Sequence, residues 1–411
     1  MQLKNKFNHS ILLSRKKYRY PLLRNGLDKF DLKKGIQVIQ SGHITMNKHT
    51  EIFEKKFAKK LKTKYAVMVN SGSSANLLAT FASCNPLRKN RFKKGDHAII
   101  QSLCWSTSLW PLVQAGLKVK FVDVNPLSLN VNVEDIISKV TQKTKVIMII
   151  NVLGLSCDIL RLKNFCRKKK IILIEDNCES LGAKYNKKYL GTYGDFGTFS
   201  FFYSHPITSG EGGMIVCNDK EDYNILKSLR SHGWSRDKKT SKKYSNLDPR
   251  YIFVNSGFNV RPLDIQAAIA LNQFKKLDKF KKIRIENRKK IINSLKKDSK
   301  WKNQFHFIDV PLKMKPSYMV FPIILNSKFK NKRKQFINEI EKRGLQTRPV
   351  ISGSFVNQPV TGLYKLNPKK IRFKGAEKIE KLGFVIGLHT TKISNNEINF
   401  IKDCLFLIDK T

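Results

Sequence analysis

The sequence predicts an α/β protein with a largely parallel sheet and a second, smaller α/β domain at the C-terminal end. Three observations predict this class. From residue 64 onward, short apolar runs alternate with helical stretches, and Gly, Ser or Pro turns separate them. After about residue 301 the strand-like runs become shorter, which indicates another domain. The composition, 41% hydrophobic and 27% charged, is typical of a globular chain and excludes a disordered or fibrous one.

Seven apolar runs are predicted to form the main sheet. In chain order they are Tyr65–Asn70, His97–Gln101, Val119–Val122, Val146–Val152, Ile171–Glu175, Thr198–Phe202 and Gly213–Cys217. The predicted helices are Ser74–Ser83, Val133–Lys139, Ile159–Lys168 and a long pair, Leu263–Leu277 and Lys279–Leu295. In the C-terminal part we predict a strand at Met319–Leu325 and a helix at Asn331–Arg343.

These elements suggest three parts: an N-terminal extension (1–30), a large domain (31–277) and a small domain (278–411). Ligands of largely parallel sheets bind beyond the carboxyl ends of the strands. We therefore expect the functional site at that edge of the large domain.

The chain has 79 Lys and Arg residues against 31 Asp and Glu, a net charge of +48. The lysines are spread along the chain, many at polar helix positions, and no nucleic-acid-binding module accompanies them, so we interpret the charge as background composition. No apolar stretch is long enough to span a membrane. The apolar piece 11–13 is too short for a signal peptide, so we expect a cytoplasmic protein.

The seven cysteines are widely scattered and mostly lie in apolar runs. No CxxC pair is present. We expect reduced core residues rather than disulfides, metal ligands or an iron–sulfur cluster.

Two segments have the chemistry of a binding site. Residues 70–75 (Asn-Ser-Gly-Ser-Ser-Ala) lie at a strand-to-helix junction, where free N–H groups and hydroxyls can bind an anion, although small residues also form simple tight turns. Glu175 and Asp176 end a buried strand, where carboxylates are costly without a partner. A protonated pyridine nitrogen would be such a partner, and an Asp beside it would make the ring an electron sink; the alternative is a helix cap.

A third segment, 199–214, reads Phe-Ser-Phe-Phe-Tyr-Ser-His-Pro-Ile-Thr-Ser-Gly-Glu-Gly-Gly-Met. In their order and spacing, the three segments resemble the DegT/StrS-type nucleotide-sugar aminotransferases, which use pyridoxal phosphate (PLP) on the type I fold. The resemblance covers nearly the whole chain and includes segments 41–46, 257–262, 347–349 and 387–389. It implies the PLP-dependent transferase fold, with a seven-stranded large domain and a small C-terminal domain.

The resemblance implies that several residues bind the cofactor phosphate. Gly72, Ser73 and Ser74 would hold it at the start of a helix, and Ser200 would add a hydroxyl. Asn259 matches an asparagine that reaches the phosphate from a partner subunit. The resemblance therefore implies a homodimer with a shared active site.

Other positions match residues around the cofactor ring and the substrate. Asp176 would pair with the pyridine nitrogen, Trp105 would stack on the ring, and Glu179 would lie on its hydroxyl side, where many relatives have Gln. Asn151 and Arg348 match positions on the substrate side.

The sequence departs from the aminotransferases at the residue that binds the cofactor covalently. His205 replaces the Schiff-base lysine, and imidazole cannot form that bond, but it can act as a general acid and base. The same replacement marks the sugar 3-dehydratase branch of the family. Pro206 is a further departure, since many dehydratases have a second His there; proline stiffens the turn and removes a backbone donor.

The resemblance therefore implies a PLP- and pyridoxamine phosphate-dependent lyase for deoxysugar and lipopolysaccharide O-antigen biosynthesis. Its substrate would be a GDP- or CDP-linked 4-keto-6-deoxyhexose that loses its 3-hydroxyl, with glutamate as the amino donor and with His205 as acid and base. Two alternatives stay open: an aminotransferase that uses Lys184, Lys187 or Lys188, and a noncatalytic regulator that binds PLP.

Overall fold

The computed structural model describes residues 18–24, 26–235 and 238–411, except for the side chains of 238, 239 and 241. All seven predicted strands are present, and they form one sheet. Across the sheet they are β1 (Tyr65–Val69), β9 (Gly213–Cys217), β8 (Phe196–Ser200), β5 (Ile172–Asp176), β4 (Thr144–Ile150), β2 (His97–Gln101) and β3 (Lys118–Val122). Strand β9 is antiparallel to both of its neighbours, and the other pairs are parallel.

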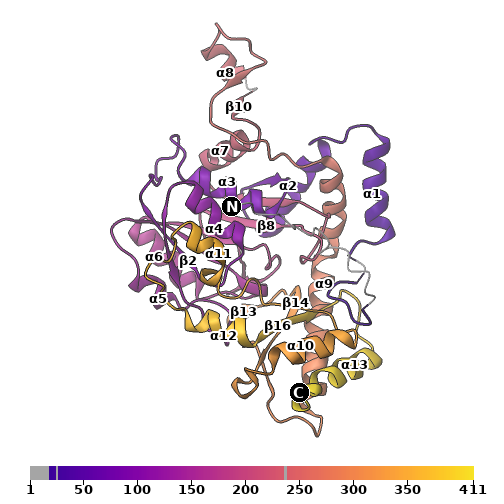
Figure 1. Cartoon of the computed structure of the whole chain (residues 1–411). Helices are drawn as coiled ribbons and strands as arrows, with labels where there is room; N and C mark the ends of the chain where they lie inside the picture. The colour runs from indigo at the N-terminus through magenta and orange to yellow at the C-terminus, as the bar shows by residue number, and fades with distance from the viewer. Residues whose placement is uncertain (1–17, 25, 236–237) are drawn as a thin grey trace, which may run out of the picture.

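Helices cover both faces of this sheet (Figure 1). They are α2 (Lys48–Leu61), α3 (Gly72–Ser83), α4 (Ser106–Gln114), α5 (Val133–Ser138), α6 (Ile159–Lys169) and α7 (Lys220–Arg230). On the α2 face the rings form a compact apolar layer: Phe57 lies 5.1 Å from Phe199 and 5.1 Å from Phe274, measured between centroids. Burial of such side chains is the main stabilising term of the domain.

Helix α9 (Asp264–Lys296) corrects the prediction of two helices, because it runs without a break for 33 residues. Its length is about 50 Å. Asp278, at the predicted break, continues the helix and forms an ion pair with Lys60 (2.7 Å). No Gly or Pro interrupts the segment, so nothing in the backbone chemistry ends the helix there. The predicted domain boundary at 277 therefore falls inside one helix.

The small domain lies at the lower end of α9 (Figure 1). Its antiparallel sheet has the order β12 (Phe305–Phe307), β14 (Val320–Leu325), β16 (Gly383–Gly387) and β15 (Thr347–Arg348). Helices α10 (Arg333–Lys342), α11 (Pro359–Leu363), α12 (Lys374–Leu382) and α13 (Asn395–Leu405) belong to the same C-terminal part.

The described part of the N-terminal extension packs against the small domain. The Tyr20 N–H donates to Gly344 O (2.9 Å), and the Tyr20 ring stacks on His389 with centroids 4.4 Å apart. The chain then enters α1 (Lys29–Gln40), which lies beside α9. The rest of the predicted extension, residues 1–17, lies outside the described residues.

Minor elements complete the chain. They are β6 (Lys184–Tyr185), β7 (Lys188–Tyr189), β13 (Met314–Lys315), β10 (Trp234–Ser235), α8 (Lys238–Lys243) and β11 (Ile252–Phe253). Strand β10 and helix α8 project from the large domain at the top of Figure 1. All seven cysteines are free thiols. Within the described ranges, no helix is long and apolar enough to cross a membrane.

Candidate active site

The turn between β1 and α3 presents a ring of hydroxyl groups and helix N–H groups. Ser71 caps the helix, since its Oγ accepts from the Ser74 N–H (3.1 Å). The Ser74 hydroxyl donates to Asn70 Oδ1 (2.6 Å), and the exposed Ser73 hydroxyl donates to Thr107 Oγ1 (2.9 Å). The first N–H groups of a helix have no intrahelical acceptor, so this turn can bind an anion.

Gly72 lets the start of α3 approach the end of β8 closely. A Cβ atom at Gly72 would lie 2.5 Å from Ser200 Cβ and 2.9 Å from Cys178 Sγ. Ser200 is buried, and its Oγ accepts from the Phe202 N–H (3.2 Å). The structure therefore brings Gly72 and Ser200 to the same turn, and any larger residue at 72 would push them apart.

Asp176 ends β5 and is held by donors from three segments. Its Oδ2 accepts from Asn76 Nδ2 (2.7 Å) and from Ser108 Oγ (2.7 Å), and its Oδ1 accepts from the Cys178 N–H (3.0 Å). Asn76 in turn accepts from Thr198 Oγ1 (2.6 Å). The carboxylate is 4% exposed and fixed in orientation at the carboxyl edge of the sheet.

Our reading of the sequence missed Asn76 and Ser108. Both are buried polar residues near the start of a helix, close along the chain to buried apolar residues such as Leu78 and Leu109. A polar residue on a buried helix face needs a partner, and this is the signal that could have identified them.

Glu175, the other carboxylate at the end of β5, has different partners from Asp176. Successive residues of a strand point to opposite faces. The Glu175 carboxylate accepts from three backbone N–H groups, those of Gly191 (2.8 Å), Tyr193 (2.6 Å) and Gly194 (2.8 Å). Burial raises its pKa, and these hydrogen bonds oppose the rise. Glu175 thus stabilises the loop before β8.

His205 lies in the turn after β8, and its N–H donates to Phe202 O (3.0 Å). Its Nδ1 atom is buried and has no hydrogen-bond partner in the described part of the chain. Burial lowers the pKa of His205 to about 4, although the charge of Asp176 opposes this effect. At neutral pH the ring is therefore uncharged and can accept a proton.

Trp105 and Glu179 are the two remaining residues predicted to lie around the cofactor ring. Trp105 precedes α4, one turn before Ser108, and its side chain is 59% exposed, so a flat aromatic face is open to a ligand. Glu179 is half-buried, and its Oε2 accepts from the Leu153 N–H (3.1 Å). Burial raises the pKa of Glu179 to about 7.

The substrate-side predictions have a different outcome. Asn151 is fully buried, and its amide donates to Asn177 Oδ1 (2.6 Å) and to Glu175 Oε2 (3.4 Å). Its Oδ1 has no hydrogen-bond partner among the described residues, and the substrate contact of Asn151 stays a prediction. Arg348 is exposed in β15, and its Nη1 donates to the carbonyl of Thr347 (2.8 Å).

Asn259 is exposed. The next residue, Val260, joins this segment to the anion-binding turn, because its carbonyl accepts from the Asn70 N–H (3.0 Å). Asn259 also forms a β-bridge with Ser231. In the described part of the chain, Asp176 is hydrogen-bonded by Asn76, Ser108 and Cys178 and not by Asn259.

The lysines of the aminotransferase alternative lie on the β6–β7 hairpin. The Lys184 ammonium lies 4.2 Å from the Tyr189 ring centroid, and the Lys188 ammonium lies 4.8 Å from that of Tyr193. Lys187 occupies the tight turn between the strands. Among the described residues, none of the three forms a hydrogen bond or ion pair with Asp176 or with His205 Nδ1.

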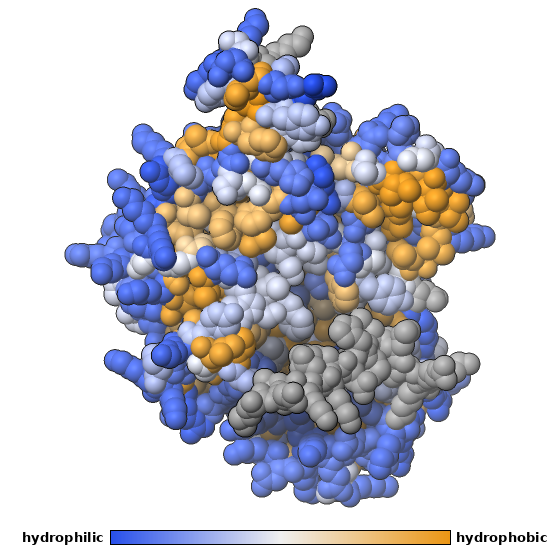
Figure 2. Space-filling model, turned by 45° about the horizontal axis from the view of Figure 1, so that its top comes forward, coloured by the Kyte–Doolittle hydropathy of each residue, from blue (hydrophilic) through white to orange (hydrophobic). Residues whose placement is uncertain are grey.

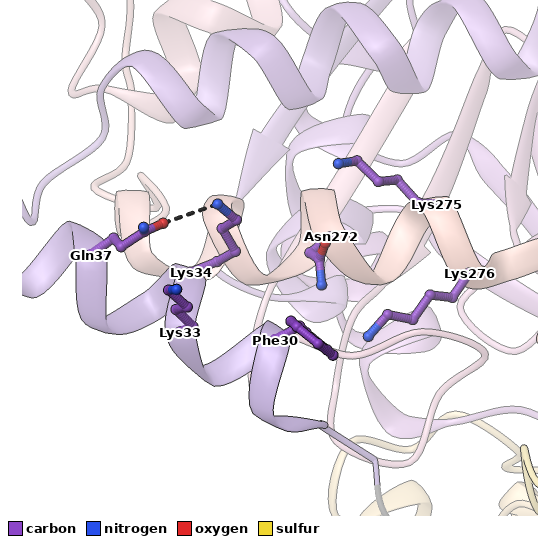
Figure 3. A pocket seen from close by; sticks show the side chains of 7 residues that line it. All are labelled: Phe30, Lys33, Lys34, Gln37, Asn272, Lys275 and Lys276. Carbon is purple, nitrogen blue, oxygen red and sulfur yellow. Dashed lines mark hydrogen bonds between the residues drawn. The ribbon is translucent and has the colours of Figure 1, made fainter.

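A groove of about 470 Å³ lies elsewhere, between α1 and α9 (Figure 3). It is lined by Phe30, Lys33, Lys34, Gln37, Asn272, Lys275 and Lys276. None of these is a predicted site residue, so the groove is separate from the candidate active site.

An anion-binding helix start, a buried strand-end carboxylate and an exposed tryptophan together define the class of protein to which this chain belongs. Residues 26–405 match the model of the DegT/DnrJ/EryC1/StrS aminotransferase family, and the chain belongs to this family.

Within the family, the chain is similar to two enzymes named GDP-4-keto-6-deoxy-D-mannose 3-dehydratase. It is 36% identical to that of Escherichia coli O55:H7 over 393 residues, which cover 94% of this chain and 99% of the relative. It is 35% identical to that of Yersinia pseudotuberculosis, with 93% and 98% covered.

Two solved structures agree. The E. coli enzyme with bound hydrated PLP superposes with a TM-score of 0.85 at 34% identity, covering 95% of this chain and 100% of that one. A structure of GDP-4-keto-6-deoxymannose-3-dehydratase with a trapped PLP-glutamate geminal diamine gives 0.84 at 34% identity, covering 94% and 100%. The predicted PLP-dependent transferase fold is therefore confirmed.

Proposed function

We propose that this chain is a PLP- and pyridoxamine phosphate-dependent 3-dehydratase that acts on GDP-4-keto-6-deoxymannose. The observation that carries the proposal is the histidine at position 205, which stands where the family's aminotransferases have their lysine. Its Nδ1 is buried and unpartnered among the described residues, and its pKa is lowered to about 4. The similarity to enzymes of this name over 93–94% of the chain supports the substrate.

The residues of the site fit the cofactor. The start of α3 and the Ser73 hydroxyl would bind its phosphate, Asp176 would pair with its ring nitrogen, and Trp105 would cover one face of the ring. The three donors to Asp176 hold its carboxylate in one orientation, and an Asp beside the ring nitrogen would keep that nitrogen protonated. When bound in its aminated form, the cofactor supplies an amino group for the sugar ketone and a ring that withdraws electrons.

His205 would move protons. In its neutral form it would remove a proton from the C4′ carbon of the bound cofactor, and as imidazolium it would donate one to the departing 3-hydroxyl. Burial of the ring keeps the neutral form dominant before the reaction. No lysine is present at position 205 to displace the product from the cofactor. The sugar would therefore be released as an unsaturated amino sugar, which would hydrolyse to the 3-deoxy-4-keto sugar and ammonia.

The proposal is tested by incubating the protein with PLP, glutamate and GDP-4-keto-6-deoxymannose. We expect one 2-oxoglutarate and one ammonia for each 3-deoxy-4-keto sugar, because glutamate supplies the two electrons that replace the hydroxyl by hydrogen. Mass spectrometry and NMR of the sugar measure this. A stably aminated sugar that keeps its 3-hydroxyl would overturn the proposal.

The pH dependence should reveal Glu179, which we place on the hydroxyl side of the ring. Its pKa of about 7 means that it is protonated below pH 7 and charged above it. We expect activity to fall as Glu179 ionises. The side chain of a Glu179→Gln variant stays neutral at every pH and can still accept the hydrogen bond from the Leu153 N–H. The ratio of variant to wild-type kcat should rise roughly tenfold between pH 7 and 8.5. Parallel pH profiles would contradict this role.

We also propose a homodimer with a shared active site. Helix α1 packs on α9 by one face, while Phe30, Leu32, Ile36 and Ile39 are each at least 50% exposed. The hydrophobic cluster at the right of Figure 2 lies over this helix. An apolar face of this kind favours a protein interface, and the exposed Asn259 would face the partner's phosphate site. Light scattering should give twice the 47.4 kDa of the chain.

A further inference from the structure

The turn that carries His205 is held by a buried arginine of helix α9. Arg284 is 2% exposed. Its Nη1 donates to Pro206 O (2.9 Å), the carbonyl next to His205 along the chain. Its Nε donates to Leu388 O (3.0 Å), just after β16 of the small domain. A single guanidinium therefore joins the catalytic turn to the small domain.

A second residue of the same helix holds the far end of the turn. Gln273 lies eleven residues earlier, which is three helical turns and therefore on the same face of α9. Its Oε1 accepts from the Thr208 N–H (3.4 Å), and its Nε2 donates to Gly26 O (3.0 Å). The turn is thus held by helix α9 at two points, Pro206 and Thr208.

Arg284 is an unusual buried cation. Within the described residues no carboxylate pairs with it, and burial lowers its pKa to about 10. Burial of an uncompensated charge is costly, so its hydrogen bonds to carbonyl dipoles are needed to keep it in place. Pro206 has no N–H, and its carbonyl is therefore the one backbone polar group through which this residue can be anchored.

We propose that Arg284 is a positioning residue for His205: its hydrogen bond to the Pro206 carbonyl fixes the turn so that the imidazole stays directed at the reacting carbon. The proposal rests on the proposed function, because it assumes that His205 moves the proton. A planar guanidinium can donate to two acceptors in fixed directions, which a lysine ammonium does less well. An arginine is therefore required where one side chain must hold two carbonyls of different domains.

The test compares three variants: Arg284→Met, Arg284→Lys and the control Asn287→Ala. Asn287 also joins α9 to the small domain, by accepting from the Ile393 N–H (3.0 Å) and donating to Thr391 O (2.7 Å), but it does not contact the catalytic turn. It controls for a general loosening of the two domains. Hydrogen–deuterium exchange of residues 202–210 is measured in the cofactor-free protein, together with kcat and KM.

We expect exchange in 202–210 to be about tenfold faster in Arg284→Met than in Asn287→Ala, because only the former frees the turn. With cofactor and sugar, kcat should fall about 10²-fold while KM changes less than about threefold, the pattern of a misplaced group. Arg284→Lys should recover part of both losses. The control should keep kcat within about threefold of the wild type.

Equal exchange in the Met and control variants would overturn the proposal, and so would a loss of kcat equal in both. If Arg284→Met does not fold, Arg284→Lys provides the same comparison, and wild-type exchange and kcat in it would overturn the proposal as well. Failure of the proposed function is recognised separately: the wild type would then form no 3-deoxy sugar, while the exchange of the turn would still report its anchoring.

Discussion

Replacement of His205 by asparagine should lower kcat by about 10²–10⁴-fold, the usual contribution of a general acid–base group. Asparagine is close to histidine in size, so the turn held by the Phe202 carbonyl should persist, but an amide does not exchange protons at neutral pH. The variant should still bind pyridoxamine phosphate, and the absorbance of the protein after gel filtration measures this binding. A kcat within tenfold of the wild type would show that another group moves the proton.

His205→Lys complements this experiment. The lysine should bind PLP covalently and shift its absorbance to longer wavelength, while dehydration is lost. Borohydride reduction and peptide mapping should place the label on residue 205 in the variant and on no lysine in the wild type. A labelled lysine in the wild type, at 184, 187 or 188, would instead support the aminotransferase alternative.

The second large effect is expected at Asp176. Asp176→Asn removes the charge that would keep the ring nitrogen protonated, and kcat should fall about 10²–10³-fold, as for the loss of one preorganised electrostatic contact. The variant should also lose about 1–3 kcal/mol of stability, because its new N–H groups meet the donors Asn76 and Ser108. Turnover per folded molecule and the free energy of unfolding measure the two effects.

Glu175→Gln is the matched control for Asp176→Asn. It changes the adjacent residue, which faces three backbone N–H groups away from the site. We expect it to lower the melting temperature while kcat per folded molecule stays within about threefold of the wild type. If the two variants lose activity equally, the difference in role between Glu175 and Asp176 is refuted.

The main sheet was predictable because its strands are buried on both faces and read as continuous apolar runs. All seven runs form strands, with ends shifted by up to two residues. The residues at the carboxyl edge, Asp176 and Ser73 among them, could be predicted because strand ends of a parallel sheet converge.

The sequence did not reveal the residues that act by positioning other residues. Arg284 lies in a helix with many exposed lysines, and the sequence alone does not show that this cation is buried while the lysines are solvated. Asn76 and Ser108 resemble ordinary helix residues until the fold brings them to Asp176. The break predicted near residue 278 was wrong: Asp278 continues the helix, and the lysines around it are good helix formers on a solvated face.

The continuity of α9 has a practical consequence for anyone who wishes to divide this protein. A cut at residue 277 would sever a helix in mid-span and remove the contacts that its second half makes with the large domain, such as those of Asp278 with Lys60 and of Arg284 with Pro206. Each fragment would lose these contacts, so residues 1–277 and 278–411 expressed as separate polypeptides should be less stable than the whole chain. The chain should therefore be engineered as one unit. Grafted or recombined variants should keep residues 264–296 from one parent protein.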